Sequence, residues 1–421
     1  MFETFNISPL LTLHVRPITK FKTRTVKIFI TRNLDNNATR AAILPFLLRR
    51  GTAKHPTTTS IAKKLENMYG TGLGTDVLKI GEWQVMEFSL EVASERFIPG
   101  KKRLFPSALS FLQELIFCPV TKNGVFRSNY LKTEVENMRR FIEGMINDKA
   151  TYATEQLIKH MCGNEAFSIY EYGDLESLKL LEPESLYQYY RGIMDSNPID
   201  VYVTGDLNPE DALGRIKKIF SFERKGGYSI KKTQLAPFPK TVKRFHERID
   251  ISQARLLIGF RTDISHNDDA VYPLILASSV FGGFPHSKLF RVVREEASLA
   301  YAVHSYLIRA KGIIIVYAGV YPAKAQEAET LIMQQFEEMK SGNISDFEIE
   351  STKKNIVDDL RAISDNASRE INFAFVSKLN GSKDTPEIAI EKILSVTKNQ
   401  IAEASRRMFL DTVYLLGPDK L

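Results

Sequence analysis

Alternating apolar and polar positions indicate the same series of strands in each half of the chain. A period of two, with β-branched and aromatic residues, is typical of strands that bury one face. The predicted strands are residues 11–15, 25–31, 83–92 and 200–206 in the first half, and 255–261, 312–320 and 412–418 in the second. The runs at 200–206 and 412–418 both stop close to a glycine, Gly205 and Gly417.

Helical periodicity lies between these strands in both halves. Leu131, Val135, Met138, Ile142 and Met145 recur at spacings of four and three, which places them along one stripe of a helix. Acidic residues at the start and glycine at the end of other segments suit the helix dipole and a helix C-cap. The predicted helices are 37–50, 59–69 and 131–145, then 268–282, 286–297 and 347–363, with a further helix capped by Asn208.

The matching order of elements predicts a duplicated domain. Val201 and Val413 lie 413 − 201 = 212 residues apart, about half of the 421 residues, which is far longer than a solenoid repeat. We therefore expect an α+β fold of two homologous halves, each a mostly antiparallel sheet packed with helices. The glycines and prolines after residue 223 predict the domains 1–225 and 246–421, joined by a linker at 226–245.

Composition narrows the class of protein. The net charge is 57 − 50 = +7, but lysine and arginine are spread along the chain and interleaved with glutamate, so we expect no nucleic-acid partner. Two cysteines form no disulfide framework, no signal peptide is apparent, and the apolar runs are too short to span a membrane. The sequence predicts a soluble cytoplasmic protein without a membrane partner.

Motifs for intrinsic catalysis are absent from the sequence. The seven histidines show no pair at i, i+4 and no HExxH or HxxEH, the spacings that place two zinc ligands on one helix face. Gly70-Thr71-Gly72-Leu73-Gly74 lacks the ending of a phosphate-binding loop and opens a strand instead. There is no GxSxG elbow. We therefore assign no catalytic residue, no metal ligand and no cofactor to this chain.

The stretch 281–301 resembles a known family. It contains a Gly-Gly loop, Ser-Lys-Leu-Phe, then Arg294-Glu295-Glu296-Ala297 and Leu299-Ala300-Tyr301. With the duplicated halves, this is similar to the insulinase/pitrilysin family of metallopeptidases, the inverted zincins, over essentially the whole chain. The resemblance implies the duplicated metallopeptidase fold, and the chain is most similar to zinc-less members that act beside a zinc-bearing sister subunit.

The chain departs from the family where the metal motif should be. The HxxEH position falls on Ala42-Ile43-Leu44-Pro45-Phe46, which offers no metal ligand and no general base. Glu134 and Glu136 lie in the helix where the family keeps a further zinc ligand. Without the histidines, we expect either of them to be a solvated helix residue or an ion-pair partner.

The resemblance implies that Arg294 and Tyr301 bind the peptide substrate. A guanidinium group can hold carboxylate or carbonyl oxygens, and a phenol can donate to a carbonyl oxygen. The alternative is that Arg294 is a surface helix residue and Tyr301 a strand residue filling the core. Gly282 and Gly283 likewise have two interpretations, as a close approach for an extended peptide or as an ordinary helix C-cap.

The sequence is therefore consistent with two functional hypotheses. In the first, this chain is a catalytically inactive, zinc-less, substrate-binding subunit of a heteromeric peptidase. Its partner would be a sister subunit that carries HxxEH and holds the zinc, and no activity is expected from this chain alone. In the second, it is a non-proteolytic scaffold or peptide-binding protein derived from the same fold. A homodimer of the isolated chain is a further possibility by analogy.

Overall fold

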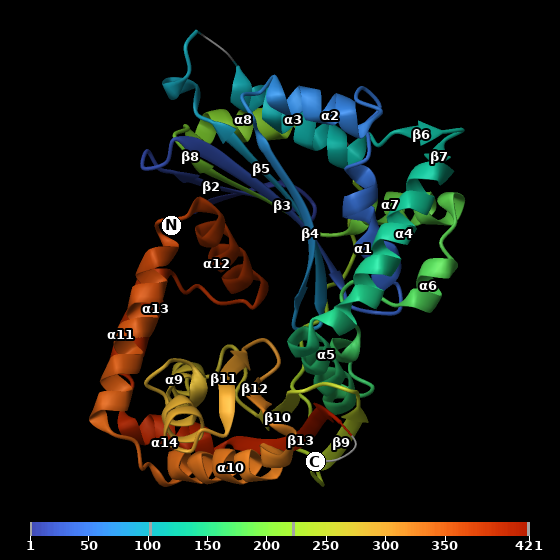
Figure 1. Cartoon of the computed structure of the whole chain (residues 1–421). Helices are drawn as coiled ribbons and strands as arrows, with labels where there is room; N and C mark the ends of the chain where they lie inside the picture. Colours follow the sequence, from blue (N-terminus) through green and yellow to red (C-terminus); the bar gives the residue numbers. More distant parts are fainter. Residues whose placement is uncertain (1, 101–102, 221–223, 419–421) are drawn as a thin grey trace. The chain divides into compact units, whose positions relative to one another are not determined.

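The structure, a computed structural model, describes residues 2–100, 103–220 and 224–418. Contacts divide the chain into two compact units (Figure 1). Unit 1 comprises residues 1–144, 169–232 and 366–374, and unit 2 comprises 145–168, 233–365 and 375–421. Each half of the sequence thus contributes one segment to the unit formed mainly by the other half.

Unit 1 is built on a six-stranded sheet of order β1-β2-β8-β3-β5-β4. β2 and β8 are parallel, and the other neighbours are antiparallel. Its strands are β1 (Glu3–Ser8), β2 (Leu11–Pro17), β3 (Thr23–Asn33), β4 (Gly72–Ile80), β5 (Trp83–Ala93) and β8 (Ile199–Gly205), and a short hairpin is formed by β6 (Thr121–Lys122) and β7 (Val125–Phe126).

Unit 2 repeats this sheet without the first strand. Its order is β9-β13-β10-β12-β11, with β9 and β13 parallel and the other neighbours antiparallel. The strands are β9 (Lys243–Arg248), β10 (Ala254–Thr262), β11 (Ala300–Ile308), β12 (Ile313–Val320) and β13 (Met408–Gly417). Because the order matches β2-β8-β3-β5-β4 strand for strand, the predicted duplicated α+β fold is confirmed.

Helices cover one face of the sheet in unit 1, where α3 and α8 lie against it (Figure 1). Alternate residues of β3, including Val26, Ile28 and Ile30, point into the main hydrophobic core of this unit. The helices are α1 (Ala38–Leu48), α2 (Thr58–Glu66), α3 (Leu104–Phe117), α4 (Ser128–Gly144), α6 (Leu175–Lys179), α7 (Pro183–Ser196) and α8 (Pro209–Ile219), with a 3₁₀ turn at Glu95–Phe97.

In unit 2, helices lie on both faces of the sheet. Phe260 of β10 packs on Phe281 and Phe336 on one face, whereas Leu257 of the same strand faces a different helix, α5. The helices are α5 (Lys149–Cys162), α9 (Val271–Gly282), α10 (Ala325–Ser341), α11 (Asp346–Ile363), α13 (Pro386–Ser395) and α14 (Lys398–Arg406), with 3₁₀ turns at Met145–Asn147, Ala166–Ser168 and Pro322–Lys324. No helix within the described ranges is long and apolar enough to cross a lipid bilayer.

Most predicted elements are present within a few residues of their expected bounds. Asn208 caps α8 by accepting hydrogen bonds from the backbone N–H groups of Glu210 and Asp211. The segment predicted as a helix at 286–297 differs, because Phe290–Glu296 forms a π-helix. In that π-helix the Ala297 N–H donates to the Val292 carbonyl, five residues back, at 3.0 Å. Such wide turns are rare, and they occur frequently at functional sites.

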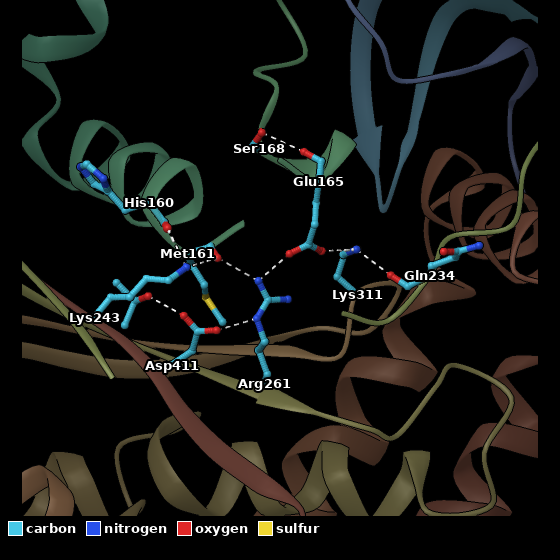
Figure 2. Close-up of polar contacts among 10 residues, drawn as sticks. His160, Met161, Glu165, Ser168, Gln234, Lys243, Arg261, Lys311 and Asp411 are labelled. Atoms are coloured by element: carbon cyan, nitrogen blue, oxygen red, sulfur yellow. Dashed lines mark hydrogen bonds and ion pairs between the residues drawn. The ribbon is translucent and has the colours of Figure 1, made fainter. Parts of the chain in front are cut away.

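A buried network of charged side chains joins α5 to the sheet of unit 2 (Figure 2). Arg261 on β10 donates to Asp411 Oδ2 at 2.6 Å, to Glu165 Oε1 at 2.5 Å and to the Met161 carbonyl at 2.9 Å. Lys311 pairs with Glu165 Oε2 at 2.7 Å. Arg261, Asp411 and Lys311 are almost fully buried, so these contacts satisfy charges that water cannot reach.

The two halves of the chain exchange equivalent segments. α5, from the first half, covers one face of the unit 2 sheet with an apolar stripe that includes Leu157 and Met161. Residues 366–374, which include the start of α12 (Ala367–Leu379), belong to unit 1. There Lys27 of β3 donates to Asn372 Oδ1 at 2.8 Å and to Glu87 at 2.6 Å.

The linker predicted at 226–245 contains neither helix nor strand until β9 begins at Lys243.

Candidate functional site

The position of the missing metal motif lies in α1, inside unit 1. Ala42, Ile43, Leu44 and Pro45 are buried there, and Phe46 is partly buried. Zinc needs nitrogen, sulfur or oxygen ligands, and these side chains supply none. Among the described residues, no three His, Cys, Asp or Glu side chains come together in a way that could hold a metal ion. The residues present at this position do not fit a zinc ion.

Glu134, on α4, has an arginine as its partner. Its Oε1 accepts from Arg50 Nε, just beyond the end of α1, and Asn137 lies 3.4 Å from its other oxygen. Glu134 is buried, so the ion pair satisfies a carboxylate that would otherwise be costly. Glu136 is partly exposed and pairs with Arg139 and Arg140, whose hydrogen bonds lower its pKa to about 2. Of the two expectations, the ion-pair one is confirmed for both glutamates.

Two cavities lie on either side of Phe46 and Glu134. One, of about 300 Å³, is lined mainly by aromatic and apolar groups from α1, α4 and the loop before α6: Phe46, Asp76, Glu134, Asn137, Met138, Phe141 and Tyr172. The other, of about 390 Å³, includes Arg49 and Arg50 in its wall. Sequence reasoning singled out neither Phe141 nor Tyr172, because their significance depends on contacts between distant segments.

Arg294 lies on the π-helix of unit 2 and is exposed. Its guanidinium carbon lies 4.4 Å from the centre of the Phe290 ring, one turn earlier on the same helix. The chain then turns through Ser298, which has a positive φ of 53°, before β11 begins at Ala300. This geometry places the Arg294 guanidinium group at the surface, free of any ion pair within the described part of the chain.

Tyr301 lies at the start of β11, an edge strand of the unit 2 sheet. Its ring packs on the neighbouring strand at Gly319, where an added Cβ would come within 2.5 Å of the phenol. The Arg255 guanidinium lies 5.6 Å from the ring centre. Tyr301 is 41% exposed, so it is held in place without filling the core.

Gly282 and Gly283 both lie close to other residues of unit 2, Ser305 and Ser279 respectively. A Cβ at Gly282 would lie 2.6 Å from the backbone nitrogen of Ser305, so glycine here lets the end of α9 approach β11. A Cβ at Gly283 would lie 2.8 Å from the Cα of Ser279. Neither glycine has a positive φ, and Gly283 is the C-cap of α9.

The elements that carry these second-half residues all meet β11, the edge strand of the unit 2 sheet. Gly282 contacts β11 at Ser305, and Tyr301 lies on the same strand, while Arg294 belongs to the π-helix that leads into it. The hydrogen bonds and ring contacts of the described residues do not join Arg294 directly to Tyr301. β12 lies between β10 and β11, so the edge of the sheet on this side is β11.

Several known proteins resemble this chain in sequence. Residues 181–356 match the family model described as "Peptidase M16 inactive domain". Over 407 residues, 96% of this chain and 95% of the relative, the sequence is 31% identical to the "Probable inactive metalloprotease YmfF" of Bacillus subtilis (strain 168). It is 24% identical over 309 residues, 72% of this chain and 73% of the relative, to the "Uncharacterized zinc protease YmxG" of the same strain.

A solved structure extends the comparison to the fold. The chain superimposes on a conserved protein from Enterococcus faecalis V583 with a TM-score of 0.92 and 26% sequence identity, covering 100% of this chain and 99% of that one. The fold of each unit therefore recurs in an experimentally determined relative.

Proposed function

Because this chain belongs to the peptidase M16 (insulinase/pitrilysin) family as an inactive, YmfF-like homologue, we propose that it binds peptides and positions them for a catalytic partner. The partner would be a sister subunit that carries HxxEH and holds the zinc. The observation that carries this proposal is the contrast between the two halves. The metal position in α1 holds only apolar side chains, whereas Arg294 and Tyr301 remain at the surface.

The chemistry of Arg294 and Tyr301 supports a role in holding an extended peptide. The guanidinium group can donate several hydrogen bonds to carbonyl or carboxylate oxygens. The phenol, held against Gly319 on the neighbouring strand, can donate to a carbonyl oxygen from a fixed position. Such groups orient the scissile bond and leave the hydrolytic chemistry to the zinc, the general base and the water of the partner.

The test is a peptide-hydrolysis assay on this chain alone and mixed with an HxxEH-bearing sister subunit, each with and without a chelator. We expect chelator-sensitive cleavage only in the mixture. Replacement of Arg294 by alanine should then lower kcat/KM of the assembled pair by about ten- to a hundredfold, because hydrogen bonds from a charged donor are lost. Arg361→Ala, a change of an exposed arginine on α11, is the matched control.

Two outcomes would contradict the proposal. Unchanged cleavage by an assembled pair that carries Arg294→Ala would remove the assigned role of the arginine. A stable complex without any cleavage would favour a scaffold that has kept the fold but lost its part in proteolysis.

A further inference from the structure

The cavity of about 300 Å³ beside the position of the missing metal motif has a wall of aromatic side chains. Phe46, Phe141 and Tyr172 line it from three segments, with the thioether of Met138 alongside. The Phe141 and Tyr172 rings are 4.8 Å apart in an edge-to-face arrangement, and Phe46 lies 6.4 Å from Tyr172. Phe141 is 51% exposed, so the aromatic wall is open to an incoming group.

The charged groups that line this cavity are both acidic. Glu134 is neutralised by Arg50, whose side chain lines the neighbouring cavity. Asp76, on β4, is exposed, and within the described part of the chain no lysine or arginine pairs with it. The cavity therefore combines π faces with one uncompensated negative charge at its rim. Aromatic faces and carboxylates both attract organic cations.

The hydrogen bonds of Asp76 limit the kind of cation that fits. Its Oδ1 accepts from the Tyr172 hydroxyl at 2.7 Å and from the Val77 backbone N–H at 2.8 Å. Oδ2 remains for a ligand, which suits a single ammonium donor better than the two-pronged fork of a guanidinium group. An unbranched aliphatic stem can lie along Phe46 and Met138 while its charged end reaches the rim.

We propose that this cavity binds a lysine side chain of a peptide, with the ammonium group at Asp76 and the stem against the aromatic wall. The proposal rests on the proposed peptide-binding function, and it adds a second contact point, in unit 1, with a stated side-chain preference. The position from which the family's metal ligands have been lost would then serve recognition. β4 is an edge strand of its sheet, so its free side leaves room for an extended chain beside the cavity.

The experiment compares two pools of fluorescent nonapeptides that differ only at the central residue, lysine or norleucine, with randomised flanking positions. Binding is measured by fluorescence anisotropy on the full chain. We expect the lysine pool to bind about fivefold more tightly, as for a cation at a partly exposed aromatic site. Asp76→Asn keeps an oxygen for Tyr172 but removes the charge, and it should bring the ratio close to one. Phe141→Ala should lower the ratio as well.

Two control variants match these changes elsewhere in unit 1. Phe97→Ala removes a phenylalanine that is 50% exposed, and Asp211→Asn neutralises an exposed aspartate at the start of α8. Both should keep the preference for lysine. Equal binding of the two pools by the unmodified chain would overturn the cavity proposal and leave the peptide-binding function standing. A preference that survives both Asp76→Asn and Phe141→Ala would also overturn it, and no binding of either pool would overturn both proposals.

Discussion

Replacing Arg261 with methionine tests whether the buried charge network fastens α5 to unit 2. Methionine keeps an apolar stem of similar length but removes the donors to Asp411, Glu165 and the Met161 carbonyl. Glu165 would keep Lys311, whereas Asp411 would keep, among the residues that the structure describes, only the Thr412 hydroxyl, at 2.5 Å. The main cost is therefore one buried carboxylate without a cation. The loss of one partner from a buried pair typically costs about 3–5 kcal/mol, and we expect a decrease of this size in the free energy of unfolding.

Urea unfolding followed by circular dichroism measures the loss of stability, and hydrogen exchange detected by mass spectrometry locates it. Amide protection in α5 should fall, because the Met161 and Glu165 contacts hold the end of that helix. Arg215→Met, at an exposed position of α8, is the control and should change stability by no more than about 0.5 kcal/mol.

A double variant identifies the cause. If the unpaired Asp411 carboxylate is responsible, adding Asp411→Asn to Arg261→Met should recover part of the lost stability. Two results together would refute this reasoning: Arg261→Met unfolds at the same urea concentration as Arg215→Met, and the α5 amides show the same protection from hydrogen exchange in both variants.

Two further predictions follow from single contacts. Gly282→Ala should lower stability by about 1–3 kcal/mol, because the new Cβ meets the Ser305 backbone, whereas Gly214→Ala, at an open position of α8, should raise it by about 0.5–1 kcal/mol. Scanning calorimetry compares them, and equal effects would contradict the packing argument. Burial, with a contribution from Arg309, lowers the pKa of His266 to about 4 from 6.5, so the unfolded chain binds the extra proton first as pH falls. The free energy of unfolding should therefore fall as the pH is lowered from about 6.5 to about 4. In urea titrations, the His266→Asn variant should lack this part of the pH dependence. Identical pH profiles of the variant and the unmodified chain would contradict the assignment to His266.

Local patterns account for the elements that the sequence predicted well. The strands at 25–31, 83–92 and 255–261 and the helix at 131–145 depend on periodicity within one segment, which the sequence displays directly. β1 was not predicted, since its residues are largely exposed and its alternation carries little apolar signal. The segment at 286–297 shows the limit of periodicity, because apolar spacing does not distinguish a π-helix from an α-helix.

The candidate site was predicted only as far as single residues and the family resemblance allow. Arg294 and Tyr301 came from the motif, while the surroundings that fix Tyr301, such as Arg255, lie on another strand. The aromatic cavity depends on Phe46, Phe141 and Tyr172, which are distant in the sequence and meet only in the folded unit. No spacing rule links them, so the sequence could show that metal ligands were missing but not what replaced them.

Because the two halves of the chain exchange segments, neither half can be produced alone as a complete unit. A fragment that ends in the linker would carry α5 without the sheet whose face it covers, leaving Leu157 and Met161 in water. It would also lack residues 366–374, and Lys27 would lose the oxygen of Asn372. Each half made separately would thus hold an unpaired helix and an uncovered sheet face. The two fragments would need to be produced together, as in split-protein complementation, for either unit to be whole.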